Sequence, residues 1–191
     1  MSINPNPPMT VQAFEAFLKR PENRGRLWEL IEGEVKEKMP TQEHGRIVVN
    51  IAYALETYAR QAQGIVAVEV RHQAPTDTNN SRLPDVAYYL DDTVPLVKEG
   101  PMTTYPELVV EVRSPDDSYS EMRVKAHFYL LKRVRVIWLV YPEKRLVEII
   151  TADDFQLILE GETLVGEDWM PDFRLPVADV FRKVNKTTQK P

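Results

Sequence analysis

Apolar residues recur along this chain at two different spacings, and these spacings predict both helices and strands. Between Thr41 and Gly64 the apolar positions follow the period of a helix, and a second helix is predicted over residues 118–133. Thr10 is placed to cap a third, shorter helix. On the second helix, the residues that we expect to face the interior are Val124, Phe128 and Leu131.

Runs rich in β-branched and aromatic residues predict the strands of a central sheet. These runs cover residues 65–73, 83–90, 106–114 and 134–142. Two hairpins are predicted outside them, one at residues 26–40 with a turn at Glu32-Gly33 and one at residues 145–161. This order of elements predicts an α/β fold in which helices flank a mixed sheet, with additional N-terminal and C-terminal hairpins.

The length of 191 residues and the hydrophobic content of 43% predict one globular domain. We assign residues 10–181 to this domain, residues 1–9 to a flexible arm and residues 182–191 to a polar tail. No apolar run approaches the roughly 20 residues of a membrane helix, and no basic segment followed by apolar residues predicts a signal peptide. The lack of cysteine suits the cytoplasm, so we expect a cytoplasmic protein without a membrane partner.

The charges of the chain give two opposing indications about nucleic acid. A net charge of −5 disfavours a general nucleic-acid binder, because such binding draws largely on the neutralisation of phosphates. A local basic segment nevertheless lies in and after the second helix, with Arg123, Lys125, Lys132, Arg133 and Arg135. This segment fits either a surface that faces DNA or a solvated helix face, and both interpretations stay open.

A carboxylate interrupts the most apolar of the predicted strands. Glu111 lies within a run of Leu and Val that is typical of a strand buried on both faces. An unpaired charge is costly in such a place, so the carboxylate needs a partner. Asp85 lies at the start of the preceding predicted strand, and consecutive strands often pair in a sheet. Pairing of these two strands would bring Asp85 and Glu111 side by side.

Two adjacent carboxylates repel one another unless a divalent cation lies between them. Mg²⁺ suits such a site, because it takes one or two carboxylates together with water and phosphate oxygens. Lys125, in the following helix, could orient a water and stabilise charge on a phosphate. The structural alternative is that Glu111 pairs with Arg113 or Arg71. Asp85 would then only bond to the backbone at the start of its strand.

Several segments of the chain carry a resemblance to one protein family. They are "LPDVAYY", "PELVVEVRSPDD", "EMRVKAHFY" and "VRVIWLVYPEKRLVEI". Their order and spacing resemble those of the Uma2 family, also called DUF820, which is part of the PD-(D/E)XK nuclease superfamily. The resemblance extends from "MTVQAFEAF" and "WELIEGEV" to the closing "MPDFRLPVADVF", and therefore covers most of the chain.

The resemblance implies a restriction-endonuclease-like fold and a Mg²⁺-dependent nuclease site, with Mn²⁺ as a substitute metal. Asp85 and Glu111 take the positions of the metal ligands. The superfamily pattern has a lysine two residues after the glutamate, where this chain has Arg113. An arginine cannot give up a proton, although it can hold a phosphate. Uma2 proteins resemble the branch in which the lysine has moved to the following helix, and here that residue is Lys125.

Three further residues are candidates for supporting roles. His44 lies in the first turn of the first long helix, where the Uma2 pattern often has a histidine. It either assists the site or only bonds near the helix start. Glu29 in the first hairpin and Glu69 in a predicted strand either approach the metal or face water. His72 and His127 have no partner spacing and are expected to be structural or exposed.

The leading hypothesis is therefore a Mg²⁺-dependent DNA endonuclease that hydrolyses phosphodiester bonds with Asp85, Glu111 and Lys125. We expect a homodimer, because cutting both strands of a duplex favours two related sites. The alternative is a catalytically inactive module of the same fold that binds nucleic acid or a protein partner. Convergence of both carboxylates with the Lys125 amine would favour the enzyme, and a Lys125 side chain in solvent would favour the module.

Overall fold

The computed structural model describes residues 7–62 and 64–184, and the chain divides into two compact units. The hairpin unit comprises Met1–Met39, Glu69–Leu83 and Leu96–Tyr105, and the sheet unit comprises Pro40–Val68, Pro84–Pro95 and Pro106–Pro191. The assignment of residues 10–181 to a single domain stays a prediction. Residues 1–6 of the predicted arm and 185–191 of the predicted tail lie outside the described residues.

The hairpin unit contains the predicted short helix and the first predicted hairpin. Its elements are α1 (Val11–Leu18), η1 (Pro21–Asn23), β1 (Leu27–Ile31) and β2 (Glu34–Lys38). The predicted cap is confirmed, because Thr10 Oγ1 accepts a hydrogen bond from the Ala13 N–H at 3.2 Å. Glu32 and Gly33 both have positive φ, as a two-residue hairpin turn requires, and β1 and β2 pair antiparallel around them. A small apolar core joins helix and hairpin through Val11, Phe14 and Leu30.

His72 is a structural residue of the hairpin unit. Its side chain is fully buried, its backbone exchanges hydrogen bonds with that of Arg82, and its ring lies 5.5 Å from the Tyr105 ring. Burial lowers the pKa of His72 from 6.5 to about 4, although a hydrogen bond with the Val70 backbone acts in the opposite direction. The folded protein therefore keeps this imidazole neutral over a pH range in which the unfolded chain protonates it.

This burial predicts a loss of stability in mild acid. Because the pKa is lower in the folded state, the contribution of His72 is complete above pH 6.5 and is lost as the pH falls toward about 4. Between pH 7.5 and pH 5 the free energy of unfolding should fall by about 2 kcal/mol through this residue alone. Urea unfolding of wild type and His72→Gln measures the difference. The exposed His127 provides the matched control, and a His127→Gln variant with the same pH dependence as His72→Gln would contradict the assignment.

The sheet unit is built around a six-stranded mixed sheet with the strand order β3-β4-β5-β6-β7-β8. The strands are β3 (Ile65–Val68), β4 (Val86–Tyr89), β5 (Leu108–Val112), β6 (Val136–Tyr141), β7 (Leu146–Ile150) and β8 (Phe155–Leu159). β5 and β6 are parallel, and the other neighbours are antiparallel. The four predicted central strands all form, but β3 is shorter than the predicted 65–73. It ends at Val68 because Glu69 has a φ of 52°, which breaks the extended backbone.

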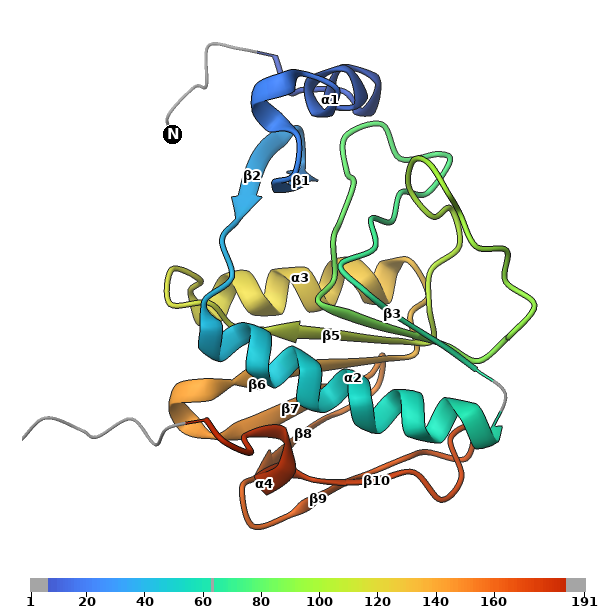
Figure 1. Ribbon diagram of the computed structural model, residues 1–191, viewed down its shortest axis with the longest axis vertical. Coiled ribbons are helices and arrows are strands. Elements are labelled where there is room, and N and C mark those ends of the chain that lie inside the picture. The colour runs from blue at the N-terminus through green and yellow to red at the C-terminus, as the bar shows by residue number, and fades with distance from the viewer. Residues whose placement is uncertain (1–6, 63, 185–191) are drawn as a thin grey trace, which may run out of the picture. The chain divides into compact units, whose positions relative to one another are not determined.

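Two long helices cover opposite faces of this sheet, as predicted (Figure 1). They are α2 (Gln42–Ala62) and α3 (Tyr119–Leu131). The apolar face predicted for α2 packs on the core through Ile47, Ile51 and Leu55, which are fully buried. Alternate residues of β5, Leu108, Val110 and Val112, belong to the same core. The residues between them, Val109 and Glu111, therefore face α3.

The inward face predicted for α3 is wrong. Val124 and Leu131 are 58% and 68% exposed, whereas the buried residues of the helix are Met122, Ala126 and Tyr129. Apolar residues occur all around this helix, so their spacing singles out no face. The packing against the sheet instead selects the face that carries Met122, Ala126 and Tyr129.

The C-terminal part of the chain adds strands at one edge of the unit and closes the core. The predicted hairpin at residues 145–161 forms β7 and β8, and these strands extend the central sheet. Four further elements follow β6 outside this sheet, and they are η2 (Pro142–Lys144), β9 (Thr163–Val165), β10 (Arg174–Pro176) and α4 (Val177–Val180). The closing segment buries Met170, Phe173, Val177 and Phe181 in the core. Across the described residues, no helix is both long and apolar enough to cross a membrane.

Candidate active site

The pairing of β4 with β5 brings the two predicted acids together. Val86 lies opposite Val110 in this antiparallel pair, so Asp85, one residue before β4, falls opposite Glu111. The Asp85 N–H donates to the Val110 carbonyl at 3.2 Å, and the Val112 N–H donates to Asp85 Oδ2 at 2.6 Å. Both acids are 1% exposed. The sheet therefore holds two buried carboxylates as cross-strand neighbours.

His44 contacts the first of these acids from α2. Its Nε2 lies 3.1 Å from Asp85 Oδ2, and both side chains are buried. The imidazole is positioned by the start of the helix, where Thr41 Oγ1 accepts a hydrogen bond from the His44 N–H at 3.2 Å. An ionised Asp85 carboxylate would only accept hydrogen bonds, and His44 Nε2 would then be the donor. His44 therefore contacts Asp85 and also bonds at the helix start, and a role for it in a metal site stays a prediction.

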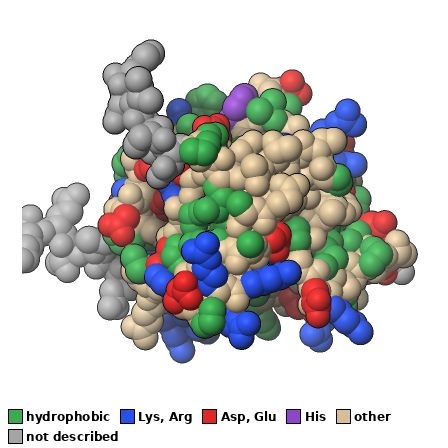
Figure 2. Space-filling view, turned by 90° about the horizontal axis from the view of Figure 1, so that it is seen from above, with side chains coloured by type: hydrophobic (Ala, Val, Ile, Leu, Met, Phe, Trp, Pro, Cys, Tyr) green, Lys and Arg blue, Asp and Glu red, His purple; other side chains and the backbone are tan. Residues whose placement is uncertain are grey.

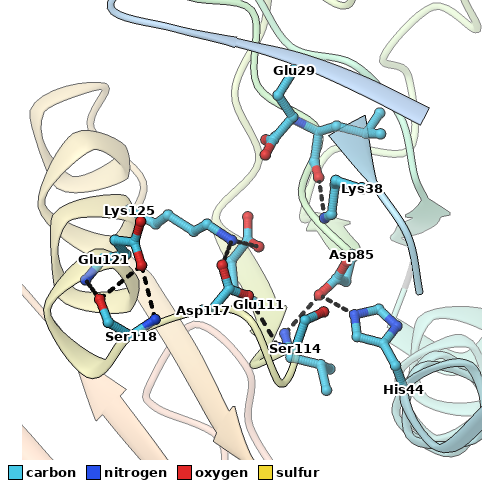
Figure 3. A network of polar contacts seen from close by, with 12 residues as sticks. Glu29, Lys38, His44, Asp85, Glu111, Ser114, Asp117, Ser118, Glu121 and Lys125 are labelled. Carbon is cyan, nitrogen blue, oxygen red and sulfur yellow. Dashed lines mark hydrogen bonds and ion pairs between the residues drawn. The ribbon is translucent and has the colours of Figure 1, made fainter. Parts of the chain in front are cut away.

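Glu111 meets two side chains of α3. Tyr129 OH donates to Glu111 Oε1 at 2.8 Å. Lys125 Nζ lies 3.6 Å from Glu111 Oε2 (Figure 3). Lys125 and Tyr129 are four residues apart and therefore lie on the same helix face. The Lys125 side chain is 12% exposed and points to the acids rather than into solvent. Lys125 thus converges with Glu111, and its convergence with Asp85 on one metal stays a prediction.

Asp117 is a residue of this site that the sequence did not single out. Its Oδ1 lies 3.4 Å from Lys125 Nζ, so the ammonium lies between Asp117 and Glu111 (Figure 3). The signal that could have indicated it is the stretch "SPDD", which ends in an acid directly before the Ser118 cap of α3. Nothing in the spacing of Asp117 and Lys125 along the chain shows that their side chains meet.

Arg113 lies elsewhere, against other side chains. Its guanidinium is 3.1 Å from Glu143 Oε1 and stacks 4.8 Å from the centre of the Tyr119 ring. The other arginine of the structural alternative, Arg71, pairs with Glu15 in the hairpin unit at 2.5 Å. These arginines thus have their own carboxylate partners, and a contact of Arg113 with phosphate stays a prediction.

The remaining candidates, Glu29 and Glu69, belong to the hairpin unit. Glu29 is 3% exposed, and its Oε1 accepts a hydrogen bond from the Leu83 N–H at 2.7 Å. This bond holds the β1 strand to the segment that precedes Asp85. Glu69 is exposed and follows the end of β3. A role for either residue near the metal stays a prediction.

A second polar cluster lies on β6, β7 and α3. Glu148, which is 3% exposed, accepts hydrogen bonds from Arg123 at 2.7 Å and from Tyr141 OH at 3.0 Å. Burial raises the pKa of Tyr141, and its hydrogen bond to Glu148 raises it further, so the phenol stays protonated as a donor. Every charge in this cluster has a partner within the fold, as expected of a structural ion pair.

The acid pair fits a divalent cation by the chemistry of its donors. Carboxylate oxygens are the ligands that Mg²⁺ prefers, and this ion completes its coordination with water and phosphate oxygens. Within the described residues, His, Cys, Asp and Glu side chains form no group of three or more that could hold a metal ion. Asp85 and Glu111 therefore suit an ion that takes two protein ligands, and they do not suit a closed site such as that of structural zinc.

The predicted basic segment does not form one continuous patch. Lys125 turns toward Glu111, Arg123 binds Glu148, and the Arg135 guanidinium lies 5.9 Å from the centre of the Trp169 ring. On the face drawn in Figure 2, Lys and Arg side chains lie among Asp and Glu side chains. A surface that faces DNA at this segment stays a prediction.

Comparisons with known proteins identify the family and the fold of the chain. Residues 14–178 match a family model described as "Uma2: Putative restriction endonuclease". A solved structure from Anabaena variabilis, titled as a "putative nuclease belonging to DUF820", has a TM-score of 0.74 and 19% sequence identity. The match covers 91% of this chain and 98% of that one. At this identity the likeness shows the fold, which is that of a nuclease-like mixed sheet flanked by helices. Among curated proteins, none matches the chain.

Proposed function

Since the chain belongs to the Uma2 family, we propose that it is a Mg²⁺-dependent DNA endonuclease, with Mn²⁺ as a substitute metal. The family description supports a nuclease. The observation that carries the metal dependence is the pair of buried, cross-strand carboxylates with an ammonium beside them. Lys125 Nζ lies 3.6 Å from Glu111 Oε2, and Asp85 is the cross-strand neighbour of Glu111.

In this proposal Asp85 and Glu111 would hold the cation, which would act as a Lewis acid on the phosphate when bound. His44 and the Val112 N–H fix the orientation of Asp85, and Tyr129 fixes that of Glu111. The ammonium of Lys125 orients the attacking water and stabilises the negative charge that develops on the phosphate. A P–O bond to the water oxygen would form while the P–O bond to the leaving nucleotide breaks. The proton of the attacking water would pass to solvent, and the leaving oxygen would take a proton from solvent.

A plasmid assay tests the function. Supercoiled DNA is incubated with wild-type protein and Mg²⁺, Mn²⁺ or EDTA, and the open-circular and linear products are separated on a gel. We expect nicking with either metal and none with EDTA. No nicking with either metal, at protein concentrations that bind the DNA, would contradict the proposal.

The second candidate is a module that binds nucleic acid or a protein partner without cleaving DNA. The residue that favours it is Arg113, which stands where the superfamily pattern has its lysine and which pairs with Glu143. The same assay separates the two functions, since a module binds its DNA or protein partner without forming cleaved product.

We further propose that the protein is a homodimer joined through β8. This strand is an edge of the sheet and exposes an apolar row on one face, with Phe155, Leu157 and Leu159 at 60%, 52% and 53% exposure. An exposed edge strand is a template for pairing with another chain. Antiparallel pairing of two copies around Leu157 would set Phe155 opposite Leu159 of the second copy, so the apolar residues would match.

Light scattering after size-exclusion chromatography tests the dimer. We expect a mass twice that of the 22.1 kDa chain for wild type and the mass of one chain for Leu157→Glu, because this change sets two carboxylates against each other at the two-fold axis. The matched control is Leu96→Glu, since Leu96 is 82% exposed in the hairpin unit. A wild type with the mass of one chain would refute the dimer.

A further inference from the structure

Asp117 is fixed by a turn at the end of β5. The stretch Ser114-Pro115-Asp116-Asp117 is a tight turn, in which the Asp117 N–H donates to the Ser114 carbonyl at 3.0 Å. Proline in the second position favours such a turn, because its φ is already correct. The Asp117 side chain reinforces the turn, since its Oδ2 accepts a hydrogen bond from the Ser114 N–H at 3.0 Å. The Oδ2 oxygen of Asp117 is thereby held within the turn. The Oδ1 oxygen is left to bind a group outside the turn.

Lys125 reaches this carboxylate because of the direction of its helix. α3 begins after Ser118, whose hydroxyl forms a capping box with Glu121. Side chains on a helix lean toward its N-terminus, so a lysine two turns into α3 extends back toward the residues before the cap. Its Nζ lies 3.4 Å from Asp117 Oδ1 and 3.6 Å from Glu111 Oε2.

We propose that Asp117 is a positioning residue for Lys125, which it holds beside Glu111 by a second ion pair. Figure 3 shows the Lys125 amine between the two carboxylates. The two acids differ in their surroundings, because Glu111 is 1% exposed within the sheet whereas the Asp117 side chain is 24% exposed in the turn. Asp117 can therefore hold the Lys125 amine even when Glu111 binds another group.

The role of Asp117 rests on the proposed function in one respect. A cation bound by Glu111 would weaken the attraction between that carboxylate and the Lys125 ammonium, and two positive charges repel. A second carboxylate that binds no metal offsets this repulsion. Asp117 then keeps the ammonium at the distance from which it stabilises a phosphate, so its removal should affect turnover and not DNA binding.

A double-mutant cycle with Asp117→Asn and Lys125→Met tests the positioning role. Asparagine keeps an oxygen that accepts the Ser114 N–H, so the turn is retained while the charge is lost. We expect Asp117→Asn to lower kcat for plasmid nicking by roughly 10- to 100-fold with KM for DNA unchanged. In the Lys125→Met background the same change should have no further effect. Asp117→Glu should restore part of the activity, and Asp116→Asn, at the exposed neighbouring acid, should match wild type.

The same four proteins of the cycle are unfolded in urea, which gives a readout that needs no nuclease activity. We expect Asp117→Asn to change the unfolding equilibrium constant by roughly 2- to 5-fold in wild type and by less in the Lys125→Met background. Equal effects of Asp117→Asn in both backgrounds, on kcat and on unfolding, would overturn the proposal. If wild type does not nick DNA, the proposed function fails, and the presence or absence of coupling in urea decides for or against the Asp117–Lys125 contact.

Discussion

We expect Glu111→Gln to lower the rate of Mg²⁺-dependent nicking by at least about 1000-fold. A cation at a phosphate supplies several kcal/mol of charge stabilisation, and each 1.36 kcal/mol corresponds to a factor of about ten. Glutamine has nearly the same shape and keeps an oxygen that can accept from Tyr129 OH, which now lies 2.8 Å from Glu111 Oε1. It removes the negative charge that faces Lys125 and that would hold a cation in the proposed function.

Nicking rates for this variant are measured by single-turnover kinetics on supercoiled plasmid. Glu56→Gln is the matched control, since Glu56 is a half-exposed carboxylate of α2 bound to Arg60. We expect this control to nick within a few-fold of wild type. Circular dichroism and urea unfolding show whether each variant is folded. A folded Glu111→Gln protein that nicks at the wild-type rate would exclude this carboxylate as a metal ligand.

Lys125→Met is expected to lower nicking by about 100- to 1000-fold while Mg²⁺ binding persists. A decrease of this size is expected when an enzyme loses one preorganised hydrogen-bond donor that points to a developing negative charge. Methionine keeps much of the apolar stem that fills the space beside Tyr129, and it removes the ammonium that lies 3.6 Å from Glu111 Oε2. Since Lys125 and the cation both balance the charge of Glu111, Mg²⁺ should bind the variant at least as tightly as wild type.

Calorimetry gives the Mg²⁺ affinity of this variant, and the plasmid assay gives its rate. Lys183→Met provides the control, because Lys183 is an exposed lysine of the sheet unit outside the predicted basic segment. We expect this control to retain the wild-type rate. Unchanged nicking by Lys125→Met would show that the ammonium is a structural partner of Glu111 and takes no part in the chemistry.

The central sheet and its helices could be predicted because their signals are strong and local. β6 is an unbroken apolar run, β5 is apolar except at Glu111, and the apolar face of α2 repeats over several turns, so each element is specified by its own residues. The end of β3 could not be predicted. It depends on a positive φ at Glu69, a conformation that glutamate seldom adopts and that no local signal announces.

The acids of the site could be predicted because a charge within a buried strand is rare. Glu111 interrupts an apolar run, and the strand order makes Asp85 its neighbour. The buried face of α3 was predicted wrongly, because Val124 and Leu131 are as apolar as Met122 and Ala126. The family pattern indicated Lys125 where the periodicity of the helix did not, since the pattern reflects the position of the lysine relative to Glu111.

The sequence did not determine the partners of residues that act through tertiary contacts. His44 could be read as a helix-start residue, and only its distance of 3.1 Å from Asp85 Oδ2 distinguishes the two interpretations. Asp117 could not be predicted as a partner of Lys125, because the contact depends on the angle at which α3 leaves the turn. The separate two-stranded sheet of β9 and β10 was also not predicted, since each of its strands is only three residues long.

The most direct test of the account is calorimetric titration of Mg²⁺ into wild type and Asp85→Asn. Asp85 is buried and is held by His44 and the Val112 N–H, so asparagine fits its place with little change of shape. We predict that wild type binds Mg²⁺ and that the folded variant does not. A wild type that binds no Mg²⁺, or a variant that binds it equally well, would contradict the metal site on which the proposed chemistry depends.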